Sequence, residues 1–72
     1  MLIIPTEHVE DYRDLSDHQK FILWEAVDKA IKFLTENYNP DGFNIGINCG
    51  EAAGQSVKHV HIHVIPRYKN IQ

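Results

Sequence analysis

Three histidines recur at alternate positions near the end of this 72-residue chain, namely His59, His61 and His63. Aliphatic residues fill the positions between and after them: Val60, Ile62 and Val64. Successive side chains of a β-strand point to opposite faces, so the pattern predicts a strand over residues 58–65 with imidazoles on one face and aliphatic groups on the other. Three imidazoles on one strand face are hard to explain by packing, and they point to chemistry.

One chemistry open to three imidazoles is metal binding. Three neutral imidazoles can hold zinc and leave a fourth position for water. The outer two of three alternate strand residues, however, have Cα atoms about 13 Å apart. Bringing all three rings to a Zn–N distance of about 2.1 Å is then awkward, so metal binding is the weaker alternative.

The other chemistry is nucleophilic catalysis at phosphorus. An imidazole can attack a phosphorus centre and form a covalent phosphohistidine-type intermediate, which divides one difficult displacement into two easier ones. The central residue, His61, is the expected nucleophile, because a histidine on each side can donate hydrogen bonds to the phosphate oxygens or the leaving group.

A glycine-containing loop, residues 50–56 (GEAAGQS), leads into the histidines. Such a loop can direct backbone N–H groups and the Ser56 hydroxyl toward an anion. Most glycine-rich loops are only turns. This loop suggests an anion site because it lies directly before three histidines.

A long helix is predicted over residues 16–38. Ser16 followed by Gln19 forms a capping-box pattern, Asp17 suits the first turn, and the sequence Asn39-Pro40-Asp41-Gly42 ends the helix. Its apolar stripe follows 3–4 residue spacing and comprises Trp24, Val27, Ile31, Leu34 and Tyr38, widened by Leu23, Ala26, Ala30 and Phe33. So wide an arc fits either a second contact with a partner subunit or a well-covered core helix.

Two further strands are expected, over residues 2–4 and 43–49. Gly46 lies in the middle of the second strand and marks a bulge, a close backbone approach or a plain surface glycine. Cys49 continues the apolar parity of that strand, which favours a small core residue over a nucleophile. The pattern predicts one α+β domain over residues 1–72, a small antiparallel sheet with one long helix packed on it.

Composition limits the classes of protein that fit. A core of this size seldom contributes more than about 3–5 kcal/mol, so oligomerisation is the natural remedy. The net charge of −3 gives no sign of a nucleic-acid-binding surface, and a single cysteine cannot form an internal disulfide. The apolar run over residues 1–5 is too short for a signal peptide or a membrane span. We therefore expect a soluble cytoplasmic protein with no membrane or nucleic-acid partner.

Residues 54–67 (GQSVKHVHIHVIPR) closely resemble the signature of the histidine-triad (HIT) superfamily, His-φ-His-φ-His-φ-φ with φ hydrophobic. The likeness extends upstream. Residues 43–50 resemble the family strand that carries a ribose- and phosphate-contacting Asn or Gln, here Asn48. Ile3-Ile4-Pro5 followed by His8-Val9 resembles the segment that leads into the helix. The resemblance implies a HIT-like fold over the whole chain.

The resemblance also implies roles for individual residues. His61 would attack the α-phosphorus and form a nucleotidyl-enzyme, His63 would contact the phosphate and help the leaving group depart, and His59 would orient the site. The residues expected to contact substrate are Asn48, Gly54, Gln55 and Ser56. His59 could instead be a packing residue, and Asn48 and Ser56 ordinary turn or strand-edge groups.

No cofactor and no metal is expected, and His8 and His18 match no catalytic role, which suggests ordinary surface or loop residues. A glutamine in the third position of the motif would resemble the nucleotidyl-transferase branch of the family; the histidine found there resembles the hydrolase branches. Their substrates are purine nucleoside phosphates such as adenosine phosphoramidates and dinucleoside polyphosphates.

Complete members carry a further N-terminal region that builds much of the base and ribose pocket. We therefore expect an N-terminally truncated form that keeps the phosphate half of the site. A catalytically weak nucleotide-binding or protein-interaction module that retains the triad is the alternative. Complete members dimerise through the helix and the strand at residues 43–48, so a homodimer is expected.

Overall fold

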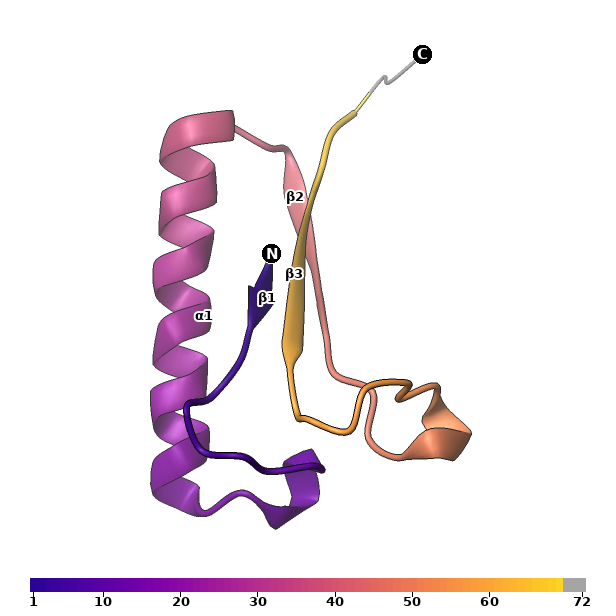
Figure 1. The fold of residues 1–72 in the computed structure, drawn as a ribbon. Helices are drawn as coiled ribbons and strands as arrows, with labels where there is room; N and C mark the ends of the chain where they lie inside the picture. The colour runs from indigo at the N-terminus through magenta and orange to yellow at the C-terminus, as the bar shows by residue number, and fades with distance from the viewer. Residues whose placement is uncertain (70–72) are drawn as a thin grey trace.

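The computed structural model describes residues 1–69 and has an α+β architecture, as predicted (Figure 1). Three strands form one antiparallel sheet, and one long helix packs against it. The elements in chain order are β1 (Leu2–Ile3), η1 (Tyr12–Asp14), α1 (Asp17–Tyr38), β2 (Gly42–Gly46), η2 (Glu51–Ala53) and β3 (Ile62–Arg67), where η marks a 3₁₀ turn.

The predicted helix is confirmed at both ends. Ser16 is the N-cap: its hydroxyl accepts from the Gln19 N–H at 3.1 Å, and the Gln19 side chain accepts from the Ser16 N–H at 2.8 Å. Asn39 ends the helix in the left-handed conformation, with φ 45°, and its N–H donates to the Thr35 carbonyl at 3.1 Å. Local capping chemistry therefore sets the limits of α1.

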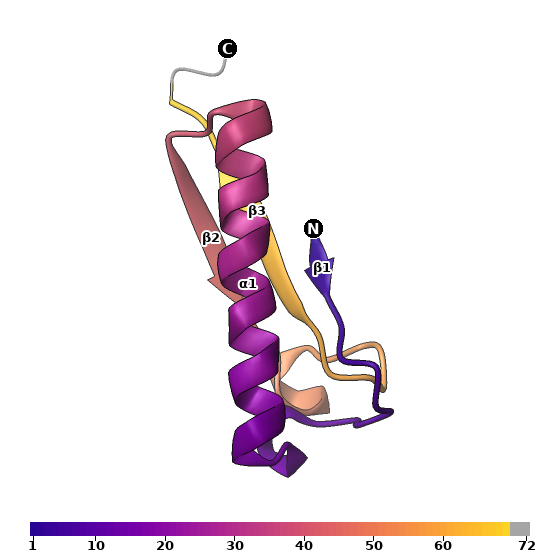
Figure 2. The same ribbon diagram turned by 90° about the vertical axis from the view of Figure 1, so that its left-hand side faces the viewer.

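The sheet has the order β1-β3-β2, with antiparallel pairing on both sides of β3. His63 pairs with Leu2 on one side and with Gly46 on the other. The strand that ends the histidine segment is thus the central one, and its neighbours are β1, at the start of the chain, and β2, which follows α1 (Figure 2).

All three strands are shorter than predicted. The β3 strand begins at Ile62 instead of residue 58, β2 ends at Gly46 instead of residue 49, and β1 ends at Ile3 instead of residue 4. Pairing between β2 and β3 stops at Gly46 and His63, and pairing between β1 and β3 stops at Ile3 and Ile62. On the β1 side, the Val64 N–H donates to the Met1 carbonyl at 2.8 Å, and the Val60 N–H donates to the carbonyl of Val9, in the loop after β1, at 2.7 Å. A loop takes the place of a strand partner, so the sheet ends before His61.

The predicted alternation of faces extends beyond the strand itself. The aliphatic side chains are almost fully buried: Val60 is 2% exposed, and Ile62 and Val64 are 0% exposed. The three imidazoles are half-buried. The chain bends at residues 57–59, so His59 lies at a bend where a strand was predicted. The alternation holds from Val60 onward, although Val60 and His61 lie outside the sheet.

The core lies between the sheet and one stripe of α1. The buried helix residues are Leu23, Val27, Ala30 and Leu34. All of these except Ala30 pack with Leu15 and the buried row of the histidine segment. Three members of the predicted stripe are exposed: Trp24 at 39%, Phe33 at 50% and Tyr38 at 59%. A single helix meeting a narrow sheet needs only one row of contacts, so these side chains stay outside the core.

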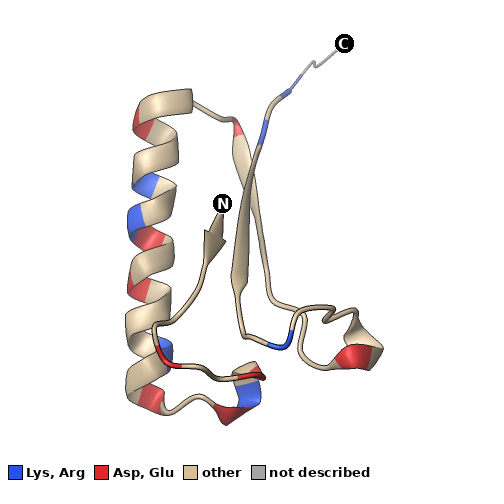
Figure 3. Cartoon of the chain, viewed as in Figure 1, with Lys and Arg blue, Asp and Glu red and all other residues tan. Residues whose placement is uncertain are grey.

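Formal charges lie mainly on α1 and in the loops, whereas within the strands the only charged side chain is Arg67 (Figure 3). Its Nε donates to the Asn44 side-chain oxygen at 2.7 Å. The strands therefore place no carboxylate beside His63. Among residues 1–69, no helix combines the length and apolarity needed to cross a membrane.

The buried row of the histidine segment can be tested through stability. We expect Ile62→Ala to lower the free energy of unfolding by about 2–5 kcal/mol, because it removes a fully buried side chain and leaves a cavity. Ile22 is 52% exposed and provides a matched control. Ile22→Ala should change stability by less than about 0.5 kcal/mol. Urea unfolding of the two variants measures both values, and equal losses would contradict this account of the core.

Candidate active site

His61 lies directly before β3, with its ring fixed by the backbone. Its Nδ1 is 3.1 Å from the carbonyl oxygen of His59. A carbonyl oxygen can only accept, so Nδ1 carries the hydrogen and, in the neutral ring, the lone pair is on Nε2. The arrangement leaves Nε2 as the nitrogen that can attack an electrophile.

His63 lies within β3, and its ring occupies space that a side chain on β2 would fill. A Cβ atom added to Gly46 would lie 2.6 Å from Nε2 of His63, closer than real Cβ contacts come. The register between β2 and β3 runs without a break through Gly46, so the glycine does not mark a bulge. Gly46 marks a close approach to β2, made by the imidazole of His63 and not by another stretch of backbone. Nothing in the sequence pattern separated these possibilities.

His59 contributes its carbonyl to the site and packs its ring against His8. The two ring centroids are 4.9 Å apart, with the planes inclined by 70°. Nε2 of His59 is buried and has no hydrogen-bond partner within residues 1–69. His8 is exposed, as expected, but it is more than an ordinary surface residue because it contacts the first histidine of the triad.

The loop that precedes the histidines is held mainly by its own backbone. Gly50 and Gly54 have φ of 88° and 92°, values that favour glycine. The N–H groups of Gly54 and Gln55 donate to Glu51 at 2.9 Å and to Gly50 at 3.1 Å. These two N–H groups, expected to face a phosphate, are thus used within the loop.

Ser56 and Asn48 keep their polar groups more accessible. Ser56 is exposed, and the hydrogen bonds found within residues 1–69 do not involve it. Asn48 is also exposed, and its amide nitrogen lies 3.6 Å from the position of a Cβ on Gly54, which places it beside the loop. Their contact with substrate stays a prediction.

The carboxamide of Gln55 joins three parts of the chain. Its oxygen accepts from the Gly50 N–H at 2.8 Å, and its nitrogen donates to the carbonyls of Val57, at 3.0 Å, and Glu10. Gln55 was expected to contact substrate, and in this structure its polar atoms hold the loop closed. Contact between Gln55 and substrate stays a prediction, and its carboxamide would have to give up one of these hydrogen bonds to make it.

The chain between β1 and α1 lies along this loop, as both ribbon views show (Figures 1 and 2). A Cβ on Gly50 would lie 3.3 Å from the Arg13 guanidinium. Arg13 in turn donates to both carboxylate oxygens of Asp11, at 3.0 and 2.7 Å. These hydrogen bonds lower the pKa of Asp11 to about 2, so the carboxylate stays ionised and paired with Arg13 near neutral pH.

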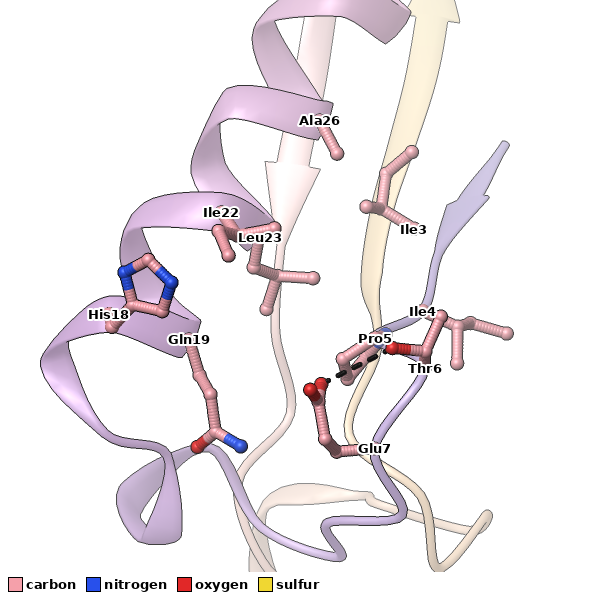
Figure 4. A pocket seen from close by; sticks show the side chains of 10 residues that line it. All are labelled: Ile3, Ile4, Pro5, Thr6, Glu7, His18, Gln19, Ile22, Leu23 and Ala26. Atoms are coloured by element: carbon pink, nitrogen blue, oxygen red, sulfur yellow. Dashed lines mark hydrogen bonds between the residues drawn. The ribbon is translucent and has the colours of Figure 1, made fainter.

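A cavity of about 250 Å³ lies on another part of the molecule, between residues 3–7 and the first turns of α1 (Figure 4). It is lined by Ile3, Ile4, Pro5, Thr6, Glu7, His18, Gln19, Ile22, Leu23 and Ala26. None of the three triad histidines lines it. Nor do His, Cys, Asp and Glu residues gather in threes that could hold a metal ion anywhere in residues 1–69.

The geometry of the histidine segment agrees with what comparison with known proteins finds. The family model described as HIT domain matches residues 1–70. A bis(5'-adenosyl)-triphosphatase of Dictyostelium discoideum is 38% identical over 69 residues, which cover 96% of this chain and 46% of that protein. An AP-4-A phosphorylase of Mycobacterium tuberculosis is 36% identical over 69 residues, covering 94% of this chain and 35% of that protein.

Among solved structures, a HIT family protein from Bacillus anthracis superposes with a TM-score of 0.89 at 39% identity. The superposition covers 96% of this chain and 49% of that one. The chain therefore spans about half the length, or less, of these relatives. Over that part, the fold, the spacing of the histidines and the family model agree, and the chain belongs to the HIT domain family.

Proposed function

We propose that this chain carries the phosphate-reacting half of a nucleotide hydrolase, in which His61 attacks the α-phosphorus of a dinucleoside polyphosphate or a nucleoside phosphoramidate. The observation that carries the proposal is the hydrogen bond between Nδ1 of His61 and the His59 carbonyl. It holds the ring in the form whose free lone pair is on Nε2.

The proposed reaction has two displacements. In the first, Nε2 of His61 forms a bond to phosphorus while the bond from phosphorus to the leaving group breaks. A protonated His63 donates its proton to the departing oxygen or nitrogen. In the second, water attacks the same phosphorus and gives a proton to the now neutral His63, the P–N bond breaks, and a nucleoside monophosphate is released with His61 and the protonated His63 restored.

The surroundings of the triad suit an anionic substrate. The strands bring no carboxylate to the sheet, and Ser56 and Asn48 hold exposed polar groups beside the histidine segment. We assign Ser56 to a phosphate oxygen and Asn48 to the ribose or phosphate. The relatives named above support the substrate class: one is a bis(5'-adenosyl)-triphosphatase and another an AP-4-A phosphorylase.

A second candidate function is a binding or interaction module that keeps the triad and turns over little or no nucleotide. Contacts within the loop favour it, because the N–H groups of Gly54 and Gln55 and the carboxamide of Gln55 already bind groups of the chain itself.

Trapping the covalent intermediate separates the two candidates. After a short incubation with an adenosine phosphoramidate, followed by quenching at alkaline pH, we expect intact-protein mass spectrometry to show one added adenylyl group. The adduct should be absent from His61→Ala. His18→Asn is a matched control, because it changes an exposed histidine outside the triad. A native chain without adduct or turnover would leave only the binding module.

Gly46 allows a test of the role given to His63. A methyl group at this position would displace the His63 ring, so Gly46→Ala should lower turnover about tenfold or more when the leaving group is an alkylamine that needs a proton. Turnover of an adenylyl ester of p-nitrophenol, whose leaving group needs no proton, should fall much less. Gly42→Ala is the control, since a Cβ there meets nothing within 4 Å. Equal losses with both substrates would contradict a proton-donating role for His63.

We also propose that the chain forms a homodimer. The β2 strand is at an edge of the sheet and carries Ile45, which is 42% exposed, and on α1 the side chain of Phe33 is 50% exposed. Unpaired edges and uncovered apolar surface favour association.

Light scattering at micromolar concentration should give about twice the 8.3 kDa mass of one chain. Ile45→Lys, on the β2 edge, should shift the equilibrium toward the monomer. Val57→Lys, in an exposed loop, should not. A single monomeric species for the native chain would refute the proposal.

A further inference from the structure

We infer that the carbonyl of Val9 positions the nucleophile, acting through the peptide group between His59 and Val60, and that His8 supports this arrangement through its ring contact with His59. The catalytic consequence rests on the proposed function. The positioning itself does not, because it concerns the state of the His61 ring in the free protein.

The inference begins with a single peptide group. The carbonyl that accepts from Nδ1 of His61 belongs to His59, and the N–H that donates to Val9 belongs to Val60. These two groups are parts of one peptide unit. Within residues 1–69 no peptide bond is cis, so the C=O and N–H of this unit are coplanar and point in opposite directions. The orientation of one therefore sets the orientation of the other.

A continuous chain of hydrogen bonds results. The Val9 carbonyl accepts from the Val60 N–H at 2.7 Å, and the His59 carbonyl accepts from His61 at 3.1 Å. If the first bond were lost, the peptide could rotate and carry the His59 carbonyl away from Nδ1. Hydrogen bonds in such a chain also polarise one another, which strengthens the His59 carbonyl as an acceptor.

Burial makes the first bond important. The side chain of Val60 is 2% exposed and is packed in the core, so a Val60 N–H that lost its partner would have little water to replace it. The short N···O distance and the buried position both indicate that this peptide has one preferred orientation. The tautomer of His61 follows from that orientation.

Three consecutive residues make the contacts that hold Val9 in place, and we call residues 8–10 the brace. The His8 ring packs edge-on against the His59 ring, the Val9 carbonyl binds the Val60 N–H, and the Glu10 carbonyl binds the Gln55 side chain. Two of these contacts reach the histidine segment, at His59 and Val60, and the third reaches the preceding loop, at Gln55. The brace thus holds the loop and the start of the histidine segment together, and His8 acts as a positioning residue through His59.

Backbone substitution tests the Val9 carbonyl directly. A chain of 72 residues is accessible to chemical synthesis and ligation. Replacing Glu10 by its α-hydroxy acid turns the Val9–Glu10 peptide into an ester, whose carbonyl is a weaker acceptor. The same replacement at Glu7 is a matched control, since the Thr6 carbonyl makes no hydrogen bond within residues 1–69.

The readout is the tautomer of His61 in the free protein, measured by ¹⁵N NMR of the imidazole. We expect the ester at Glu10 to lower the population of the Nδ1–H form, and the ester at Glu7 to leave it unchanged. In an active protein kcat should fall about threefold to tenfold with KM unchanged, the effect of weakening one hydrogen bond.

Side-chain variants test His8 and give a result even if the ester chain fails to fold. His8→Ala removes the ring contact and should lower the Nδ1–H population, whereas His8→Phe keeps a ring against His59 and should preserve it. An unchanged tautomer in the folded ester chain and in His8→Ala would overturn the inference. A tautomer shift in a chain without turnover would support the positioning role and count against the proposed function alone.

Discussion

Burial of alternate aliphatic side chains beneath α1 is the constraint on which the site depends. Val60, Ile62 and Val64 enter the core almost completely, and an extended chain must then direct the residues between them to the other side. His61 and His63 therefore share a face because the residues on either side of them are buried, whereas His59 lies at a bend of the chain. A polar residue in the aliphatic row would disturb the site and the fold together.

The site is built largely from backbone groups and from the absence of side chains. The His59 carbonyl accepts from the His61 ring, and the Val9 carbonyl accepts from the N–H of the same peptide group. The ring of His63 has room because its neighbour on β2 is Gly46. Gln55 adds a side chain that works in the same way, since it binds one N–H and two carbonyls. Such groups tolerate changes of side-chain identity around them, provided that the backbone keeps its path.

The sheet is covered on one face only, and the chain corresponds to about half, or less, of the relatives named above. Several large apolar residues lie exposed in or beside β1 and along α1, among them Leu2, Ile4 and Phe21. A fold of this size gains little stability from its own core, so a second surface that covers these residues would contribute a large share of the total. The proposed function and the proposed homodimer are coupled for that reason.

Much of the architecture could be predicted from sequence, because it follows from local rules. The capping box placed the start of α1, the sequence after Tyr38 placed its end, and period-two alternation placed the histidines opposite the buried row. The likeness to the histidine-triad family also came from contiguous residues. Strand ends were predicted less well, because a strand stops where its partner stops, and the partner of Val60 is a loop residue fifty positions earlier.

Contacts between distant segments could not be predicted in the same way. Gly46 had three possible explanations until the register placed it beside His63, and His8 had no assigned role until the fold brought its ring to His59. The carboxamide of Gln55 was assigned to substrate from its place in the motif, and only the fold showed which groups of the chain it binds. Residue types and spacing determined which groups can do chemistry and which face they share. Only the tertiary structure decided how those groups are held. They are held by backbone carbonyls, which every residue has, and by the space beside a glycine, so the amino-acid sequence does not show which positions make the contacts.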